Sequence, residues 1–382
     1  MGKRTGSALG LAIVAAMSLL VAPARATALP RIRHVFTIVL ENNEMATTFT
    51  AGQVLAPYLT RTLPLAGAFV PNYFGTGHSS LDNYIAMTSG QGPNPATQGD
   101  CHDASTMGDN GHFWVDGDGQ AIGVGCTYPA QVTSIATQLT DAGFSWKAYN
   151  QDMDAQPGVF RTTCRGPFTE KIIESPVPAG SPKTPDDYKD KHNPFVYYHS
   201  VFDDLSYCDA RDVALTGFEN DLQSEATTAN FSFIVPNQCD DAHDIPSCSD
   251  GTQGGLSRAD AFLKKWVPLI QASPAYKDDG VIVIIFDEGV TGLACCNEKT
   301  SPNVGPSGTN SNFPFPGPLG AGGGQTGAVF LSKFIKPGTI SLGSYNHYSY
   351  LRSMEDLFGL AHLGYAAQQG LQPFGADIFS AG

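Results

Sequence analysis

Acidic, amide and histidine side chains directly follow three separate apolar runs of the sequence. Carboxylates at neighbouring strand ends would repel one another unless a cation lay between them. Oxygen ligands suit a hard divalent ion, and a histidine extends the choice to softer metals. We therefore expect a metal site, with Ca²⁺, Mg²⁺, Mn²⁺ and Zn²⁺ left open, although each acid alone would also fit a helix N-terminus or a solvated loop. The residues are Glu41 and Asn42 after run 35–40, Asp240, Asp241 and His243 after run 231–235, and Asp287 and Glu288 after run 281–286.

Two consecutive serines, Ser79 and Ser80, stand at the start of a helical pattern. A hydroxyl at a helix N-terminus lies where backbone N–H groups bind phosphate. If a metal is close by, such a hydroxyl becomes an activated nucleophile. Ser79 with Asp82 also fits a capping box, and for Ser79 we favour this structural interpretation.

Short apolar runs alternate with helical patterns along the rest of the chain. The runs lack polar alternation, which is typical of strands buried on both faces. This order predicts an α/β fold of three layers, α/β/α, with a mainly parallel central sheet. Such sheets bind ligands beyond the carboxyl ends of their strands. The predicted strands cover residues 35–40, 68–71, 144–149, 231–235, 281–286 and 328–331, and the predicted helices cover 81–88, 132–142, 213–227, 258–271 and 350–360.

The N-terminus has the features of an export signal. Two basic residues precede an apolar run over residues 8–22, and small residues follow at 24–26. This order is typical of a secretory signal peptide. We expect residues 1–26 to be that signal, with an uncleaved anchor as the alternative, and residues 27–382 to form a single domain. Because no later stretch is long and apolar enough for a transmembrane helix, we expect a secreted protein, extracellular or periplasmic, without a transmembrane segment.

The charge balance excludes some partners and constrains others. The net charge is -14 and only 15% of residues are charged, which argues against nucleic-acid binding. Removing residues 1–26 removes Lys3, Arg4 and Arg25 but no acid, and takes the net charge to -17. An anionic substrate would then need a local positive centre, most simply a metal ion, to overcome the field of the whole protein.

Eight cysteines, an even number, favour disulfides in an exported chain. The alternative, a zinc–thiolate site, lacks any CxxC pair. The adjacent Cys295 and Cys296 either pair with each other or have separate partners. By proximity in the sequence, the other pairs are predicted to be Cys101–Cys126, Cys164–Cys208 and Cys239–Cys248.

Seven blocks of the chain, in order, resemble the bacterial and fungal phosphoesterase family. That family holds secreted acid phosphatases, phosphatidylinositol-3-phosphatases and non-haemolytic phospholipases C. The resemblance extends from about residue 33 to 364, nearly the whole chain after the predicted signal. The blocks are residues 39–42 (VLEN), 77–90 (GHSSLDNYIAMTSG), 146–149 (WKAY), 192–195 (HNPF), 236–244 (PNQCDDAHD), 286–289 (FDEG) and 346–349 (NHYS).

The resemblance implies an alkaline-phosphatase-like fold and assigns roles to particular residues. Ser80 would be both the nucleophile and a metal ligand, and His192 and His243 would line the phosphate pocket. Asp241 and His347 are candidates for additional ligands or phosphate contacts. The sequence departs from the family at Ser79 and Asp82, where the family often has proline, and so leaves Ser79 as the alternative nucleophile. The implied metal ligands are Glu41, Asn42, Ser80, Asp287 and Glu288.

The implied activity is a metal-dependent phosphomonoesterase that forms a phosphoserine intermediate. Its substrate would be a small phosphomonoester or a phosphoinositide. The alternative is a phosphodiesterase or phospholipase C that uses the same site. Because the phospholipases C of the family carry additional C-terminal domains and this chain ends soon after the helix predicted over residues 350–360, we expect a monoesterase.

Overall fold

The computed structural model describes residues 1–2, 30–101, 114–155, 161–166, 187–304 and 322–380. Its centre is an eight-stranded sheet in which every pairing is parallel except those of β10 with its two neighbours. In order across the sheet, the strands are β11 (Thr339–Ile340), β2 (Ala68–Val70), β10 (Ala328–Ser332), β9 (Gly280–Phe286), β1 (His34–Leu40), β8 (Phe231–Val235), β6 (Trp146–Asn150) and β7 (Asp212–Ala214).

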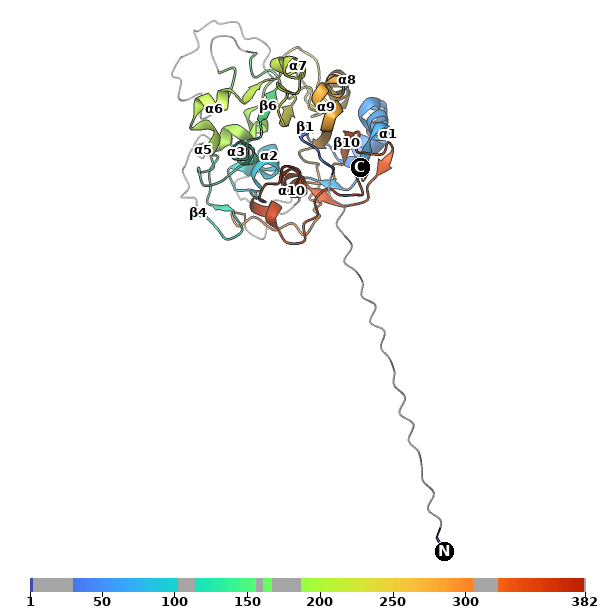
Figure 1. Ribbon diagram of the computed structural model, residues 1–382. Coiled ribbons are helices and arrows are strands. Elements are labelled where there is room, and N and C mark those ends of the chain that lie inside the picture. The colour runs from blue at the N-terminus through green and yellow to red at the C-terminus, as the bar shows by residue number, and fades with distance from the viewer. Residues whose placement is uncertain (3–29, 102–113, 156–160, 167–186, 305–321, 381–382) are drawn as a thin grey trace.

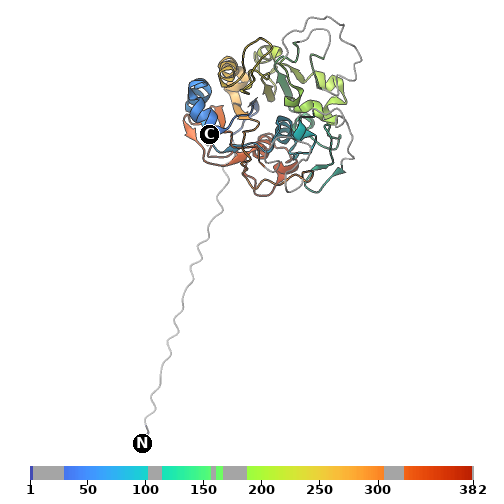
Figure 2. The ribbon, with the colours of Figure 1, turned by 180° about the vertical axis from the view of Figure 1, so that it is seen from behind.

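Two layers of helices cover the sheet, as the alternation of side chains along β1 requires. Val35 and Val39 point into one hydrophobic core, whereas Phe36 and Ile38 point into the other. Figures 1 and 2 show the two layers from opposite sides. The first core is covered by α2 (Ser80–Ser89), α3 (Ile135–Asp141), α5 (His199–Phe202), α6 (Leu205–Asp209) and α10 (His347–Phe358), and the second by α1 (Leu63–Ala66), α7 (Phe218–Asp221), α8 (Leu256–Ala272) and α9 (Pro274–Asp279).

The predicted three-layer α/β fold is confirmed, and so is each predicted strand to within two residues. Two small ribbons lie outside the sheet, one formed by β3 (Tyr73–Phe74) with β12 (Tyr345–Asn346) and one by β4 (Trp114–Val115) with β5 (Ala121–Ile122).

The predicted helix over residues 213–227 is wrong at its start, where the structure has a strand, and it extends beyond the end of the observed helix. The segment begins inside β7, because Val213 pairs with Tyr149 of β6 at the edge of the sheet. The short α7 follows, and the hydroxyls of Thr227 and Thr228 donate to the Asp221 carbonyl at the end of that helix. Apolar spacing alone could not distinguish this strand–turn–helix segment from one long helix.

All eight cysteines are in disulfides, and the pairs predicted from proximity are confirmed. Cys295 and Cys296 pair with each other. The predicted signal peptide, residues 1–26, lies outside the described residues except for its first two, so it stays a prediction. Within the described ranges, no helix is long and apolar enough to cross a membrane.

Candidate active site

Three neighbouring strands end at one edge of the sheet and bring their following residues together. β1 and β9 are parallel with Leu40 opposite Phe286, so Glu41 and Asp287 are the next residues on adjacent strands. The Asp287 amide donates to the Leu40 carbonyl at 2.9 Å, and the Glu41 amide donates to the Asp241 carbonyl at 2.6 Å. β8, whose following loop carries Asp241, lies on the other side of β1. Residues from three distant parts of the sequence thus meet at one edge.

The Glu41 carboxylate ties this edge to helix α2. The side chain is fully buried. Its Oε2 accepts a hydrogen bond from Ser80 Oγ at 2.9 Å, and its Oε1 accepts one from the Tyr84 hydroxyl at 2.7 Å. Because Ser80 and Tyr84 are four residues apart, they lie on the same face of α2. The helix therefore presents a serine hydroxyl directly to a strand-end carboxylate.

The two serines differ in what their hydroxyls bind. Ser79 precedes α2 with a φ of 84°, an unusual conformation for a residue with a side chain. Its hydroxyl donates to the Gln98 carbonyl at 2.7 Å and makes no helix cap, so the predicted capping box with Asp82 is wrong. Ser80 is the first residue of the helix and is bonded to Glu41. Of the two hydroxyls, that of Ser80 faces the carboxylates.

The loop before α2 is fixed by the side chain of Asn83. Its Oδ1 accepts from the amides of Thr76 at 2.8 Å and Gly77 at 3.1 Å, and its Nδ2 donates to the Gly77 carbonyl at 3.0 Å. A Cβ atom on Gly77 would lie 2.6 Å from Asp82 Oδ1, so a larger residue here would displace the Asp82 carboxylate. The block over residues 77–90 is therefore built to hold the N-terminus of α2 in place.

Asn42 links the carboxylate of Asp287 to the ring of His243. Its backbone amide donates to Asp287 Oδ1 at 3.0 Å. With its side-chain nitrogen facing Asp287, Asn42 lies 3.2 Å from each carboxylate oxygen and accepts from His243 Nε2 at 3.0 Å. Its φ of 40° is one that asparagine tolerates.

Glu41, His192 and Asp241 form a compact set of buried potential metal ligands. One ligand atom from each lies within 4.8 Å of the others. His192 Nε2 is 3.3 Å from Glu41 Oε2, and Nδ1 is 3.8 Å from Asp241 Oδ2. Within the described part of the chain, neither ring nitrogen nor Asp241 Oδ2 has a hydrogen-bond partner. Buried polar atoms left in this state are costly, and a divalent cation would satisfy them, so the residues fit the metal implied by the resemblance.

The electrostatics of the site show an excess of negative charge. The pKa values of Glu41, Asp241 and Asp287 are all raised, first because burial disfavours their charged forms and then because they lie beside other carboxylates. The pKa values of His192 and His243 are lowered, first by burial and then by a nearby lysine. The imidazoles are therefore neutral near pH 7, the form in which histidine binds a metal.

Glu288 turns toward a histidine rather than toward Glu41. Its Oε2 lies 2.6 Å from His78 Nδ1, and His78 Nε2 lies 2.9 Å from the Thr291 carbonyl. Among the described residues, His347 contacts the site through the Asp287 carbonyl, which its Nε2 approaches to 2.5 Å. Burial lowers the pKa of His347 to about 4. Both residues therefore support the strand end that carries Asp287.

Lys191, which was not predicted from the sequence as a site residue, lies beside the predicted nucleophile. Lys191 belongs to the 3-10 turn Asp190–His192, and its Nζ is 3.5 Å from Ser80 Oγ. The same Nζ donates to Asp100 Oδ2 at 2.8 Å, and Asp100 Oδ1 accepts from the Leu81 amide of α2 at 3.0 Å. A signal was present, because this lysine directly precedes the block at residues 192–195.

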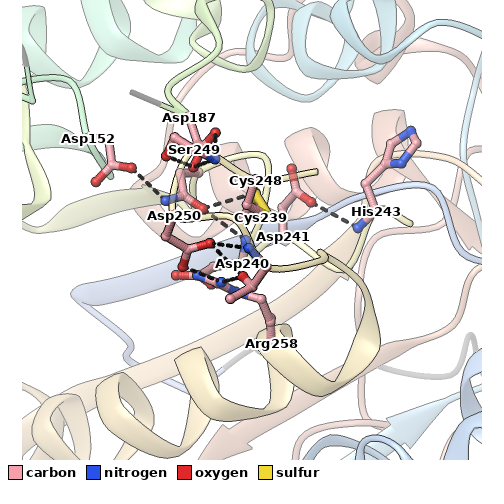
Figure 3. Close-up of a disulfide and its surroundings, with 12 residues drawn as sticks. Asp152, Asp187, Cys239, Asp240, Asp241, His243, Cys248, Ser249, Asp250 and Arg258 are labelled. Carbon is pink, nitrogen blue, oxygen red and sulfur yellow. Dashed lines mark hydrogen bonds and ion pairs between the residues drawn. A yellow bond between two sulfur atoms is a disulfide. The ribbon is translucent and has the colours of Figure 1, made fainter. Parts of the chain in front are cut away.

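Asp241 and His243 lie on the disulfide loop, residues 239–250, within which Cys239 is bonded to Cys248 (Figure 3). The His243 amide donates to Asp241 Oδ1 at 2.9 Å, which fixes the turn between the two residues. Ion pairs to α8 hold the outer side of the loop. The loop is therefore fixed both covalently and electrostatically where it meets the site.

The comparison with protein families identifies the chain. Residues 41–361 match the Phosphoesterase family, a span that contains all of the strand-end residues described above. The chain belongs to this family. Membership in the phosphoesterase family makes the protein a hydrolase of phosphoric esters, as the sequence blocks predicted.

Individual relatives within the family are distant. A phosphatidylinositol-3-phosphatase of Mycobacterium tuberculosis is 24% identical over 341 residues, which cover 89% of this chain and 82% of the relative. A phosphate-repressible acid phosphatase of Penicillium chrysogenum is 28% identical over 227 residues, 59% of this chain and 42% of the relative. Among solved structures, an alkaline phosphatase superfamily protein of Vibrio parahaemolyticus has a TM-score of 0.44 at 15% identity, with 88% of this chain and 69% of that chain covered.

Proposed function

We propose that the protein is an exported, metal-dependent phosphomonoesterase that forms a phosphoserine on Ser80. The observation that carries the proposal is the Ser80 hydroxyl at the N-terminus of α2, 2.9 Å from Glu41 Oε2 and among buried carboxylates. A helix N-terminus offers N–H groups to a phosphoryl oxygen. Phosphatase relatives, including a phosphatidylinositol-3-phosphatase, support small phosphomonoesters or phosphoinositides as substrates.

The metal would be held by the strand-end residues. Glu41, Asp241 and His192 supply a buried set of ligand atoms, and Asp287 extends it from the adjacent strand. A divalent ion bound there would neutralise the carboxylates and lower the pKa of a nearby hydroxyl. Among the predicted ligands, Asn42 lies next to Asp287. Glu288 is bonded to His78 and would support the metal ligands rather than bind the metal itself.

In the proposed reaction the Ser80 oxygen attacks phosphorus and the alcohol leaves on the opposite side. Glu41 Oε2 is the acceptor toward which the hydroxyl proton points. His243 is neutral in the free site, but a phosphate dianion bound beside it would favour the protonated ring. Because His243 is half-buried and its Nδ1 has no hydrogen-bond partner among the described residues, we assign this protonated form the transfer of a proton to the leaving alcohol. Water then hydrolyses the phosphoserine and releases phosphate. His192, fully enclosed and stacked on Tyr84, would serve as a metal ligand instead.

Export of the protein is supported by its disulfides. Four disulfides that close without a free cysteine are typical of proteins that fold in an oxidising compartment. We therefore propose that residues 1–26 direct secretion, to the periplasm or the medium.

The adjacent serines provide a matched test. S80A should abolish hydrolysis of p-nitrophenyl phosphate and of phosphatidylinositol 3-phosphate, by roughly 10⁴-fold or more, as for other lost nucleophiles. S79A, which removes a hydroxyl bonded to Gln98, should remain within about tenfold of wild type. Rapid acid quenching followed by mass spectrometry should find a phosphoryl group on the peptide that contains Ser80.

Two results would contradict the proposal. If S80A remains active and S79A does not, the wrong serine has been assigned. If bis-p-nitrophenyl phosphate or phosphatidylcholine is hydrolysed faster than the monoesters, the protein is a phosphodiesterase or phospholipase C that uses the same site.

A further inference from the structure

Lys191 is the cationic side chain that contacts the candidate nucleophile. Its Nζ lies 3.5 Å from Ser80 Oγ and 2.8 Å from Asp100 Oδ2. An ammonium group has three donors. Among the described residues, two of these donors have partners, and the one to Ser80 is long, so Nζ retains hydrogen-bonding capacity beside the Ser80 hydroxyl.

Asp100 fixes the lysine against the start of α2. One carboxylate oxygen accepts from Lys191 and the other from the Leu81 amide, so a single side chain couples the ammonium group to the first turn of the helix. Asp100 is followed by Cys101, whose disulfide with Cys126 ties down this turn. The side chain of Lys191 is 19% exposed, and such a long side chain is rarely enclosed to this degree without a fixed role.

The charge of Lys191 reaches the whole site. It opposes the raised pKa values of Glu41, Asp241 and Glu288, and it contributes to the lowered pKa values of His192 and His243. The positive charge of Lys191 therefore acts on acids and histidines around Ser80.

We propose that Lys191 binds a non-bridging oxygen of the phosphoryl group on Ser80 and makes the site prefer dianionic phosphomonoesters to monoanionic phosphodiesters. The inference rests on the proposed function and deepens it. A fixed positive charge stabilises a group of charge -2 about twice as much as one of charge -1 at the same distance. Asp100 is the positioning residue, because it holds the ammonium group beside the serine.

The test compares K191M with K189M. Lys189 lies two residues earlier on the same segment, and its removal changes the net charge equally. It has no contact with Ser80 among the interactions of the described residues. Both variants are loaded with the divalent ion that supports wild-type activity, and thermal unfolding confirms that each is folded.

The first measurement is calorimetric titration of inorganic phosphate into each variant on an S80A background, which removes turnover from the readout. K191M should weaken phosphate binding by about 10- to 100-fold, the usual effect of losing a charge-assisted hydrogen bond. K189M should change it by less than about threefold, as expected for a half-buried charge with no contact to Ser80 among the described residues. Equal affinity of K191M and K189M for phosphate would overturn the proposal.

The second measurement compares substrates in the proteins that retain Ser80. For K191M, kcat/KM should fall about tenfold more for p-nitrophenyl phosphate than for bis-p-nitrophenyl phosphate. K191R, which keeps the charge in a different shape, should recover the wild-type ratio of the two substrates. Equal losses on both substrates would mean that Lys191 only supports the structure. A failure of the proposed function itself would be recognised separately, because wild type and S80A would then not differ.

Discussion

Two adjacent aspartates on the disulfide loop face opposite situations. Asp240 accepts a hydrogen bond from Arg258 Nε at 2.7 Å, on the outer side of the loop (Figure 3). It accepts another from Gln151 Nε2 at 2.7 Å. Asp241 is fully buried, and within the described residues its Oδ2 has no hydrogen-bond partner. The protein provides a positive partner for the first charge and leaves the second among other carboxylates.

The outer acids of the loop stabilise the fold through ion pairs, whereas Asp241 is placed to bind a cation. Asp250, on the outer side of the loop, has a lowered pKa, first because of Thr252 and then because of Arg258. Asp241 has a raised pKa, first because of burial and then because of Glu41. A fold that supplies an arginine for the outer acids, but surrounds Asp241 with carboxylates whose effect Lys191 only partly offsets, is stabilised when a cation binds there.

Removal of the metal should have the largest effect. A protein stripped of divalent ions by a chelator should lose turnover of p-nitrophenyl phosphate entirely and regain it when an ion is returned, because Glu41, Asp241 and Asp287 then repel one another. The melting temperature should fall in parallel, since an ion that binds only the folded state stabilises it. Unchanged turnover and an unchanged melting temperature in a verified metal-free sample would show that the buried carboxylates around Asp241 do not bind a cation.

Replacing Asp240 or Asp241 by asparagine tests directly whether the two aspartates have different roles. D241N should lower kcat/KM on the order of 100-fold or more, because a candidate ligand is lost. Without metal, D241N should be more stable than wild type by about 1–3 kcal/mol, because one of the repelling charges is gone. Turnover and denaturant unfolding, each with and without metal, measure both effects.

D240N is the matched control. It should keep activity within about threefold and lose less than about 1 kcal/mol of stability, with or without metal, because it weakens a partly exposed ion pair. Equal effects of D240N and D241N on metal response would show that the two aspartates do not differ in the proposed way.

Asp212 lies between Asp240 and Asp241 in its surroundings, because it is buried but has neutral hydrogen-bond partners. It is buried and accepts hydrogen bonds from the amides of Asn150 and Asn193 at 2.8 Å each, but burial outweighs these bonds and raises its pKa to about 7. Between about pH 4 and 7 the folded protein holds a proton that the unfolded chain has released. The stability contributed by this group is therefore complete below about pH 4 and is lost as the pH rises through about 7.

D212N should remove that loss. The free energy of unfolding of wild type should fall by an additional ~3 kcal/mol between pH 4 and 7.5 relative to the variant. Asn150 Oδ1 and Asn193 Oδ1 have no partner among the described residues, so both amides can turn to accept from the new side chain. Urea unfolding at the two pH values measures the difference, and parallel curves would place the Asp212 pKa in the normal range.

The smallest effect is expected at Arg258. R258M removes the partner of Asp240 and should lower the free energy of unfolding by less than about 1 kcal/mol, because the arginine is partly exposed. The loss should shrink further in high salt, which screens the pair already in the wild type. A large loss of turnover in this variant would mean that the outer ion pairs position the site after all.

The strand ends were predictable because each depends on a local pattern. A buried strand such as residues 281–286 is visible as an apolar run, and Asp287 is visible as the polar residue after it. The helix over residues 213–227 was mispredicted because β7 forms only through pairing with β6, a contact that local spacing does not encode. The disulfides were predicted by proximity, because each joins cysteines that follow one another along the chain.

By itself, the amino-acid sequence determined the family, the alternation of strands and helices, and the residue types that gather at the carboxyl edge of the sheet. Only the tertiary structure decided that Ser80 rather than Ser79 faces Glu41, that Glu288 turns to His78, and that Lys191 lies next to the serine. The reason is that these choices depend on which atoms meet across separations of tens to hundreds of residues, 111 between Lys191 and Ser80. Local patterns specify the elements, whereas the direction of a hydroxyl or an ammonium group is set by the partners that the packed fold brings to it.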